Sequence, residues 1–198
     1  MDLTFVSTNP GKFREVAALL APFGVRARWS RSALPELQSD RLETVARAKL
    51  AAVPGRVRRV LVEDSGLFLG AFPGFPGVYS APVHALLGPG PLLELVDGRD
   101  RSAAFRTVAA LRWDGEVRLF HGEVRGRLAR RPRGANGFGF DPIFIPGGER
   151  RTFAEMRAEE KDAISHRAQA IRRAGRWIRR RASLRAGAAA HRSGPEQM

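Results

Sequence analysis

The stretch that decides the fold is AAFRTVAALRWDGEVRLFHGEVRGRL, residues 103–128. Its two halves, 103–113 and 116–128, are rich in apolar, aromatic and β-branched residues and are predicted to be strands. Asp114–Gly115 lies between them, and an Asp-Gly pair in that place is the strongest short-range signal for a β-hairpin. The sequence therefore predicts one long antiparallel pair of strands.

Around this hairpin, predicted strands alternate with predicted helices. Apolar runs predict strands, and amphipathic patterns predict helices. The strands are expected at 3–7, 25–29, 57–63 and 142–145, and the helices at 10–23, 42–53, 83–96 and from 159 to about 181. Asp64–Ser65–Gly66 is expected to end the strand at 57–63, and 133–139 to form a loop. This order predicts an α/β fold with a mixed β-sheet flanked by helices.

Length and composition limit the class of protein. A chain of 198 residues has the length of a single domain. Because there is no Cys, a disulfide framework and a thiolate metal site are excluded. No apolar run reaches the roughly 18–20 residues that span a bilayer, and the first residues lack the pattern of a signal peptide. We expect a cytoplasmic protein with no membrane partner.

The formal net charge is +14, from 34 Lys+Arg and 20 Asp+Glu. Residues 1–149 contribute +6 and residues 150–198 contribute +8, mostly on the helix predicted at the C-terminal end. Its apolar stripe would comprise Ile164, Ala168, Ile171, Gly175, Ile178 and Ala182, with Arg172, Arg173, Arg176, Arg179 and Arg180 off the stripe. These arginines are interpreted either as a solvated face or as a nucleic-acid surface. We expect one domain over 1–181 and a disordered basic tail over 182–198.

Lysine is rare in this arginine-rich chain. Only Lys12, Lys49 and Lys161 occur, against 31 Arg. An ammonium group is a compact charge that a guanidinium does not replace, so these three positions are candidates for a specific role.

The segment STNPGK, residues 7–12, follows a predicted strand and opens a predicted helix. Free backbone N–H groups at such a helix start bind anions, and Lys12 adds a charge suited to a polyphosphate. The spacing is not that of a Walker loop. The segment alone is equally compatible with an ordinary capped helix.

Three carboxylates are candidate metal ligands. Glu63 and Asp64 lie where a strand is expected to end, and Glu36 lies in an irregular segment before a helix. A few carboxylates together with substrate phosphates and water usually hold Mg²⁺. Glu63 and Asp64 are alternatively interpreted as turn caps.

Two later segments contain candidate binding residues. In ANGFGFDP, residues 135–142, glycines around Phe138 and Phe140 would allow a flat ring to stack, and Asp141 has an acceptor for a base N–H. The alternative is a loop anchored in the core by its phenylalanines. In EEKDAISHR, residues 159–167, four side chains bring donors within about two helical turns: Lys161, Ser165, His166 and Arg167. The alternative for His166 is a structural role in the helix.

Taken in order, these segments resemble the non-standard purine nucleoside triphosphate pyrophosphatases, also called inosine triphosphate pyrophosphatases. The matching motifs are STNPGK at 7–12, LPELQSDRLE at 34–43, VEDSG at 62–66, GFPGVYSA at 74–81, GFGFDPIF at 137–144 and FAEM…EEKDAISHR at 153–167. The resemblance covers about residues 1–180. It implies an elongated fold of two lobes with a nucleotide cleft between them, a homodimer, and Mg²⁺-dependent hydrolysis of ITP, dITP and XTP to the monophosphate and pyrophosphate.

The resemblance also implies roles for individual residues. Asp64 would be the general base, Glu36, Glu63 and Asp64 would hold Mg²⁺, and Ser65 would contact substrate. The other substrate-binding residues would be Ser7, Thr8, Asn9, Pro10, Gly11, Lys12 and Lys49 for the triphosphate; Phe138, Gly139, Phe140 and Asp141 for the base; and Lys161, His166 and Arg167 for phosphate or base.

One departure concerns the segment after YSA, where relatives commonly place a Lys or Arg and this chain has Pro82-Val83-His84. One phosphate contact is therefore either lost or supplied by His84 or a distant Arg. The alternatives to the implied function are a pyrophosphatase for other modified nucleotides, and a basic nucleic-acid-binding module. The sequence has no recognisable RNA-binding signature, so we expect no specific nucleic-acid partner.

Overall fold

The computed structural model describes the backbone of residues 1–192 and the side chains of residues 1–184. Its centre is a six-stranded sheet in the order β2-β1-β3-β4-β5-β6. The strands are β1 (Asp2–Val6), β2 (Arg26–Ser30), β3 (Arg59–Leu69), β4 (Ser102–Trp113), β5 (Glu116–Leu128) and β6 (Phe144–Pro146). β1 is parallel to β2 and β3, and the pairs from β3 to β6 are antiparallel. The predicted mixed sheet is confirmed.

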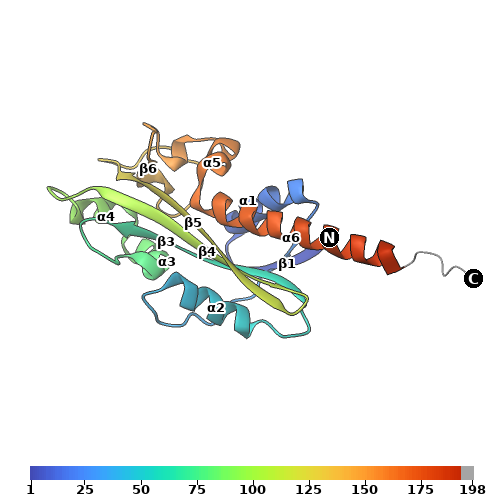
Figure 1. The fold of residues 1–198 in the computed structure, drawn as a ribbon. Helices are drawn as coiled ribbons and strands as arrows, with labels where there is room; N and C mark the ends of the chain where they lie inside the picture. Colours follow the sequence, from blue (N-terminus) through green and yellow to red (C-terminus); the bar gives the residue numbers. More distant parts are fainter. Residues whose placement is uncertain (193–198) are drawn as a thin grey trace, which may run out of the picture.

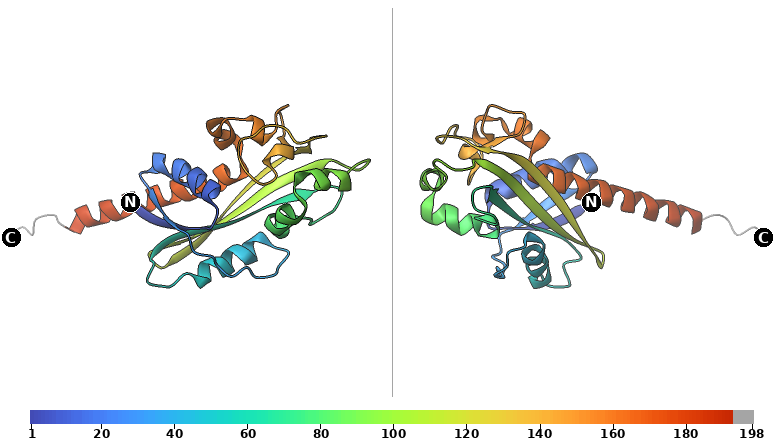
Figure 2. Two further views of the ribbon diagram at one scale, coloured as in Figure 1. Left: turned by 180° about the vertical axis from the view of Figure 1, so that it is seen from behind. Right: turned by 60° about the vertical axis from the view of Figure 1, so that its left-hand side comes forward.

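Helices cover both faces of this sheet (Figure 1). They are α1 (Pro10–Leu20), α2 (Leu42–Ala52), α3 (Ser80–Leu87), α4 (Pro89–Leu95), α5 (Ala158–Ile164) and α6 (His166–Arg192). α1 and α6 pack together on one face, whereas α2 packs on the opposite face against β3 and β4. The two further views show α6 extending well beyond the sheet at its C-terminal end (Figure 2).

The apolar core consists of three clusters, one on each face of the sheet and one at an end of the long strands. One apolar cluster joins α1 and α6 to the sheet and includes Phe5, Leu61 and Ile171. A second cluster under α2 includes Leu50 and Val62. The third lies at the other end of the long strands, with α4 and the segments after β5. It comprises Leu67, Leu69, Leu92, Leu93, Val96, Ala103, Phe105, Leu128, Phe140, Ile143, Phe144, Phe153 and Met156.

The hairpin predicted from residues 103–128 is confirmed almost residue for residue. β4 and β5 pair from Ser102↔Arg127 to Trp113↔Glu116. Asp114 and Gly115 both have positive φ, 50° and 94°, as a two-residue hairpin turn requires. At 12 and 13 residues, these strands are about twice the common length, so they carry the sheet across two of its clusters.

The prediction that Asp64–Ser65–Gly66 ends a strand is wrong. β3 continues to Leu69, paired with β4 without interruption from Arg59↔Trp113 to Leu69↔Ala103. The polar side chains are tolerated in mid-strand because lysines pair with both carboxylates and Ser65 bonds across to Thr107.

Two predicted helices are each interrupted. The helix expected at 83–96 is divided into α3 and α4 at Gly88, which has φ +71° and precedes Pro89. The C-terminal helix is divided at Ser165, which has an extended ψ of 156°. Ile164, placed on the predicted apolar stripe, therefore belongs to α5 and is 36% exposed. The short strand expected at 142–145 lies instead at Phe144–Pro146.

On α6 the predicted stripe is confirmed at Ala168, Ile171, Gly175 and Ile178, which are buried, whereas Ala182 at its end is half-buried. Of the five arginines off the stripe, Arg172 is half-buried and the other four are exposed. α6 continues to Arg192, so residues 182–192 of the expected tail are helical backbone. The last six residues of the expected tail, 193–198, lie outside the described residues.

Candidate active site

The loop between β1 and α1 is held by its own side chains. Ser7 Oγ accepts a hydrogen bond from the Asn9 N–H at 3.1 Å, and Asn9 Oδ1 accepts one from the Lys12 N–H at 3.1 Å. Pro10 occupies the first turn of the helix, where its missing N–H is not needed. The STNPGK segment is therefore a capped helix start, and the remaining free N–H groups of that turn can bind an anion.

Gly11 allows this helix start to approach the loop around Phe138. A Cβ at residue 11 would lie 2.6 Å from Cδ1 of the Phe138 ring. The next residue, Lys12, extends to Glu63 on β3, with 2.6 Å between Nζ and Oε1. The N-terminal segment is thus fixed both to the aromatic loop and to the central strand.

Glu63 lies at the centre of a buried group of charges. Its Oε2 accepts from Ser65 Oγ at 2.5 Å and lies 3.5 Å from Arg167 Nε. Burial alone would raise the pKa of Glu63, but the positive charges of Arg167 and Lys12 outweigh it and hold the pKa well below its ordinary value. Glu63 is therefore a carboxylate whose charge fixes two cations.

Ser65 connects this group to the neighbouring strand. Its Oγ lies 2.5 Å from Oγ1 of Thr107, directly opposite on β4, and 3.4 Å from Arg167 Nη2. Thr107 is only 1% exposed. The sequence analysis did not single out Thr107, because an isolated threonine in a strand is ordinary in sequence, and only the register places it against Ser65.

Asp64 points to the opposite face of β3 and meets Lys49 on α2. The Asp64 Oδ1–Lys49 Nζ distance is 2.6 Å, and Glu36 Oε1 lies 2.9 Å from the same nitrogen. Burial raises the pKa of Asp64, although Lys49 and Lys12 oppose the rise. Asp64 Oδ2 is buried and has no hydrogen-bond partner among the described residues.

These carboxylates fit a divalent cation in part. Carboxylate oxygens are the ligands that Mg²⁺ prefers, and one or two of them with substrate phosphates are sufficient. Asp64 and Glu36 converge on one ammonium group, and Asp64 has the free buried oxygen. Within the described residues, no three Asp, Glu, His or Cys side chains gather as a metal cluster would. Glu63, paired with Lys12 and Arg167, is the least available of the three predicted ligands.

The loop before β6 is shaped by Asp141. The Phe138 N–H donates to Asp141 Oδ2 at 2.8 Å, and Lys161 Nζ lies 2.6 Å from the same oxygen. Gly137, with φ +74°, is needed here because a Cβ at that position would lie 2.2 Å from Asp141 Oδ2. Asp141 is buried, and one of its two carboxylate oxygens, Oδ2, is engaged within the protein.

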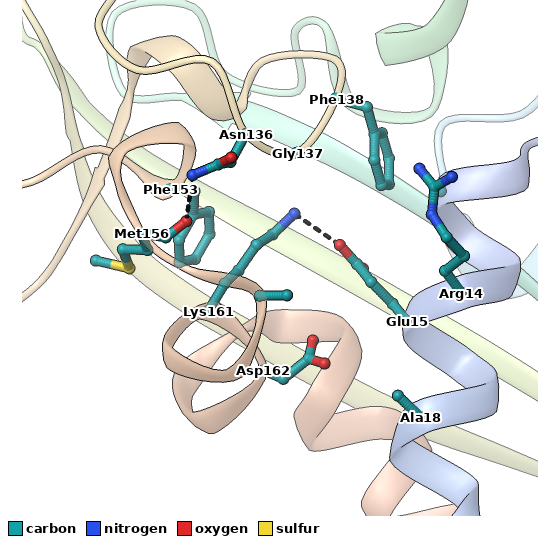
Figure 3. Close-up of a pocket in the computed structure, with 12 residues that line it drawn as sticks. Arg14, Glu15, Ala18, Asn136, Gly137, Phe138, Phe153, Met156, Lys161 and Asp162 are labelled. Atoms are coloured by element: carbon teal, nitrogen blue, oxygen red, sulfur yellow. Dashed lines mark hydrogen bonds and ion pairs between the residues drawn. The ribbon is translucent and has the colours of Figure 1, made fainter.

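Glu15 on α1 holds two of the predicted cations together, and Figure 3 shows its pair with one of them, Lys161. Its Oε1 lies 2.8 Å from Lys161 Nζ, and its Oε2 lies 2.5 Å from Arg167 Nη1. Burial would raise the pKa of Glu15, but the charges of Arg167 and Lys161 lower it. Glu15 could not be found from the sequence, because its partners Lys161 and Arg167 are 146 and 152 residues away in the chain.

His166 begins α6 and is buried. Its ring stacks on Phe105 with 4.6 Å between centroids and 8° between planes, and its Nδ1 has no hydrogen-bond partner among the described residues. Burial, reinforced by the charges of Arg167 and Lys161, lowers the pKa of His166 well below its ordinary value. The imidazole is therefore neutral at pH 7, with one nitrogen donor and one acceptor.

A cavity of about 330 Å³ brings the separate segments together. The predicted residues in its wall are Asn9, Lys12, Ser65, Phe138, Gly139, Phe140, Asp141, His166 and Arg167. Ser80, Ala81 and Phe105 also line it and were not predicted, and His84, considered above only as a substitute, lines it as well. His84 meets Phe140 edge-on at 5.1 Å. One of the two substitutes considered for the basic residue missing after YSA is thus in the wall.

The other predicted residues lie outside this wall. Ser7, Thr8, Pro10, Gly11, Lys49, Glu36, Glu63, Asp64 and Lys161 do not line the cavity. Two of them contact a residue of the wall directly: Glu63 pairs with Lys12, and Lys161 pairs with Asp141.

A second cavity, of about 370 Å³, lies between α1 and α5 (Figure 3). Phe138 lines both cavities and so forms part of the wall of each. Asp162 lines the second, where burial and repulsion by Glu15 raise its pKa to about 6.

Amides at a helix start beside a lysine, buried carboxylates and an aromatic-walled cavity are typical of an α/β protein that binds a phosphate-bearing ligand. The Ham1 family model matches residues 3–177, so the chain belongs to the Ham1 family. This confirms the resemblance stated from the sequence.

Known relatives match along most of the chain. A dITP/XTP pyrophosphatase of Thermococcus kodakarensis is 47% identical over 181 residues, covering 90% of this chain and 98% of that protein. A dITP/XTP pyrophosphatase of Pyrococcus horikoshii is 42% identical over 181 residues, covering 90% and 97%. Among solved structures, a HAM1 protein from Coxiella burnetii aligns with a TM-score of 0.75 at 31% identity, covering 90% of this chain and 98% of that one.

Proposed function

We propose that this protein hydrolyses non-standard purine nucleoside triphosphates, namely ITP, dITP and XTP, to the monophosphate and pyrophosphate. The observation that carries the proposal is the cavity in which the phosphate-type helix start, with Lys12, faces the aromatic loop at Phe138 and the donors of His166 and Arg167. Relatives named dITP/XTP pyrophosphatases share 42–47% of their residues with it over nearly their full length.

In this proposal the triphosphate lies at the N-terminal end of α1. The free N–H groups of the first turn and the ammonium of Lys12 offset the charge that develops on the departing pyrophosphate. Lys49, between Asp64 and Glu36, supplies a second positive charge on the other side of β3.

Asp64 is proposed as the general base that takes a proton from the attacking water. Burial raises the pKa of its carboxyl, which strengthens it as a base, and its Oδ2 has no other partner among the described residues. Mg²⁺, held by Asp64 and Glu36 with Glu63 nearby, would neutralise phosphate charge and orient the water.

Base selection is assigned to the start of α6. A 6-oxo purine presents an acceptor to the donors of Arg167 and of the neutral His166, whereas adenine presents an amino group that would leave them unpaired. A site built around such bonds can reject the wrong partner by about 10⁴-fold. Glu15 and Glu63 hold Arg167 in place for this role.

The proposed reaction uses nucleotides of the cytoplasm, and we propose that the enzyme acts there. Within the described residues, no helix has a stretch both long and apolar enough to cross a bilayer.

We also propose a homodimer. Exposed apolar side chains gather on the segment from Tyr79 to Leu95, with Leu86 84% exposed, and such a patch favours contact with another protein surface.

The experiment is a panel of nucleoside triphosphates with purified protein and Mg²⁺, scored separately for pyrophosphate and orthophosphate. We expect pyrophosphate from ITP, dITP and XTP, and little from ATP. Preferential hydrolysis of dTTP or modified UTP would instead support a pyrophosphatase for other nucleotides.

The Asp64→Asn variant tests the base within the same assay. Loss of a general base lowers kcat by about 10²–10⁴-fold. The exposed Asp97→Asn variant is the control and should retain full turnover. Near-normal turnover of Asp64→Asn would remove Asp64 from the chemistry.

A further inference from the structure

An arginine-lined groove lies where β5 ends beside β6, separate from both cavities described above. Its volume is about 470 Å³. Its wall consists of Arg127, Arg130, Arg131, Arg133 and Arg150, with Ala129 and Ile145. Ala129 and Ile145 are buried, so they form the floor from which the arginines rise. No acidic residue is part of the wall.

Four of the five arginines of this groove have no acidic partner, unlike most arginines on the strands of the sheet. On the strands, Arg59, Arg106 and Arg125 pair with acidic side chains at 2.6–3.1 Å. In contrast, the side chains of Arg127, Arg130, Arg131 and Arg150 make no hydrogen bond, ion pair or ring contact within the described part of the chain. All four are exposed.

The fifth arginine fixes the shape of the groove. Arg133 Nη2 donates to the Arg150 carbonyl at 2.8 Å and lies 3.3 Å from Glu155 Oε2. Its backbone N–H donates to the Pro142 carbonyl, and its carbonyl accepts from Thr152 Oγ1. Arg133 therefore ties the segment 130–133 to the segment that carries Arg150, and brings the four unpaired arginines around one floor.

This arrangement is unfavourable for the protein alone. Like charges repel, and here no carboxylate of the groove wall offsets them. A ligand with several phosphate groups would offset the repulsion, because the guanidinium fork bonds phosphate oxygens in pairs. No aromatic side chain lines the groove, so bases have nothing to stack on, and contacts would be made to the backbone regardless of sequence.

We propose that this groove binds the phosphate backbone of nucleic acid. The site is distinct from the arginine face of α6 considered in the sequence analysis. Figure 1 places β6 near the opposite end of the molecule from the C-terminal end of α6. The groove also shares no wall residue with the cavity assigned to the nucleotide.

The test measures binding of a fluorescent dT20 oligonucleotide to the full chain by anisotropy between 50 and 200 mM NaCl. In the groove variant, Arg127, Arg130, Arg131 and Arg150 are changed to Gln. Arg133 is kept because it organises the wall. The matched control changes four exposed arginines outside both the groove and the α6 face, Arg31, Arg47, Arg56 and Arg99, to Gln, and so removes the same net charge.

We expect the groove variant to bind at least 10-fold more weakly than the wild type at 100 mM NaCl, and the control less than 3-fold more weakly. Four phosphate contacts account for about a 50-fold loss of affinity between 50 and 200 mM salt, and the groove variant should lack that share of the salt dependence. An Arg130→Glu/Arg131→Glu variant gives a second reading, and thermal unfolding verifies that each protein is folded.

Three outcomes would overturn the proposal. Equal weakening of the groove variant and the control would mean that only net charge matters. Unchanged binding by the groove variant would place the contact elsewhere. A wild-type protein that binds inorganic polyphosphate but not dT20 would make the groove a site for another phosphate chain.

Discussion

Replacing Glu15 by Gln removes the negative charge that Lys161 and Arg167 share. The substitution keeps the size of the side chain, removes its charge and replaces one acceptor oxygen by an NH2 donor. The side chains of Lys161 and Arg167 are only 5% and 2% exposed, so water cannot take the place of the carboxylate. Each cation retains one other partner, Asp141 for Lys161 and Glu63 for Arg167.

The expected loss of stability follows from these contacts. Removing one partner of a buried ion pair costs about 3–5 kcal/mol, and the remaining partners place Glu15→Gln at the lower end, about 3 kcal/mol. For a chain of this length, each kcal/mol shifts Tm by about 2–4 °C, so we expect Tm to fall by about 6–12 °C. Urea unfolding at pH 7.5 measures the same free energy independently.

The control for this experiment is Glu159→Gln. Glu159 lies on neighbouring α5, is exposed and makes no ion pair within the described residues, so its replacement should leave Tm within about 1 °C. If Glu15→Gln changed Tm no more than Glu159→Gln, the buried charges would not depend on Glu15, and the assignment of Glu15 as their support would be refuted.

Two further predictions follow from other parts of the site. Asp162 has a folded pKa of about 6 against 3.8 for the free group, so the native state binds the extra proton and loses stability as pH rises from about 4 to 6. Asp162→Asn should therefore be more stable than the wild type, by a Tm difference that grows over that range and is constant above it; a difference independent of pH would contradict this. Gly122→Ala would place a Cβ 1.9 Å from the His166 carbonyl, displace the start of α6, and lower kcat/KM for ITP at least 10-fold. Gly90→Ala, with no atom within 4 Å of the new Cβ, is its control, and equal activity of the two variants would show that α6 need not move.

The elements with strong local signals could be predicted from the sequence. The β4–β5 hairpin follows from Asp114–Gly115, and the start of α1 follows from Pro10 and the two possible caps before it, Thr8 and Asn9, of which the structure uses Asn9. The stripe on α6 follows from its spacing. These features depend on neighbours in the chain, so the residues themselves reveal them.

Most of the predictions that were wrong or missing concern features that depend on tertiary contacts. Asp64 resembles a strand end because its side chain is polar, and only Lys49, 15 residues away in the chain, makes its burial possible. The pairing of Glu15 with Arg167 joins residues 152 apart, and no local pattern indicates it. Gly88–Pro89 could have indicated the break between α3 and α4, since Pro disfavours helix in the preceding residue.

Glu63 and Asp64 are adjacent in mid-strand, and they serve opposite faces of the sheet: Glu63 meets Lys12 and Asp64 meets Lys49. Because each of the two consecutive carboxylates must reach its own face of the sheet, the length of the strand before them is fixed. One inserted or deleted residue between Arg59 and Glu63 would exchange the two faces and move every buried apolar neighbour to the opposite face of the sheet as well. We therefore expect variation in the length of this family to fall in the connecting loops, with the spacing within β3 kept constant between relatives.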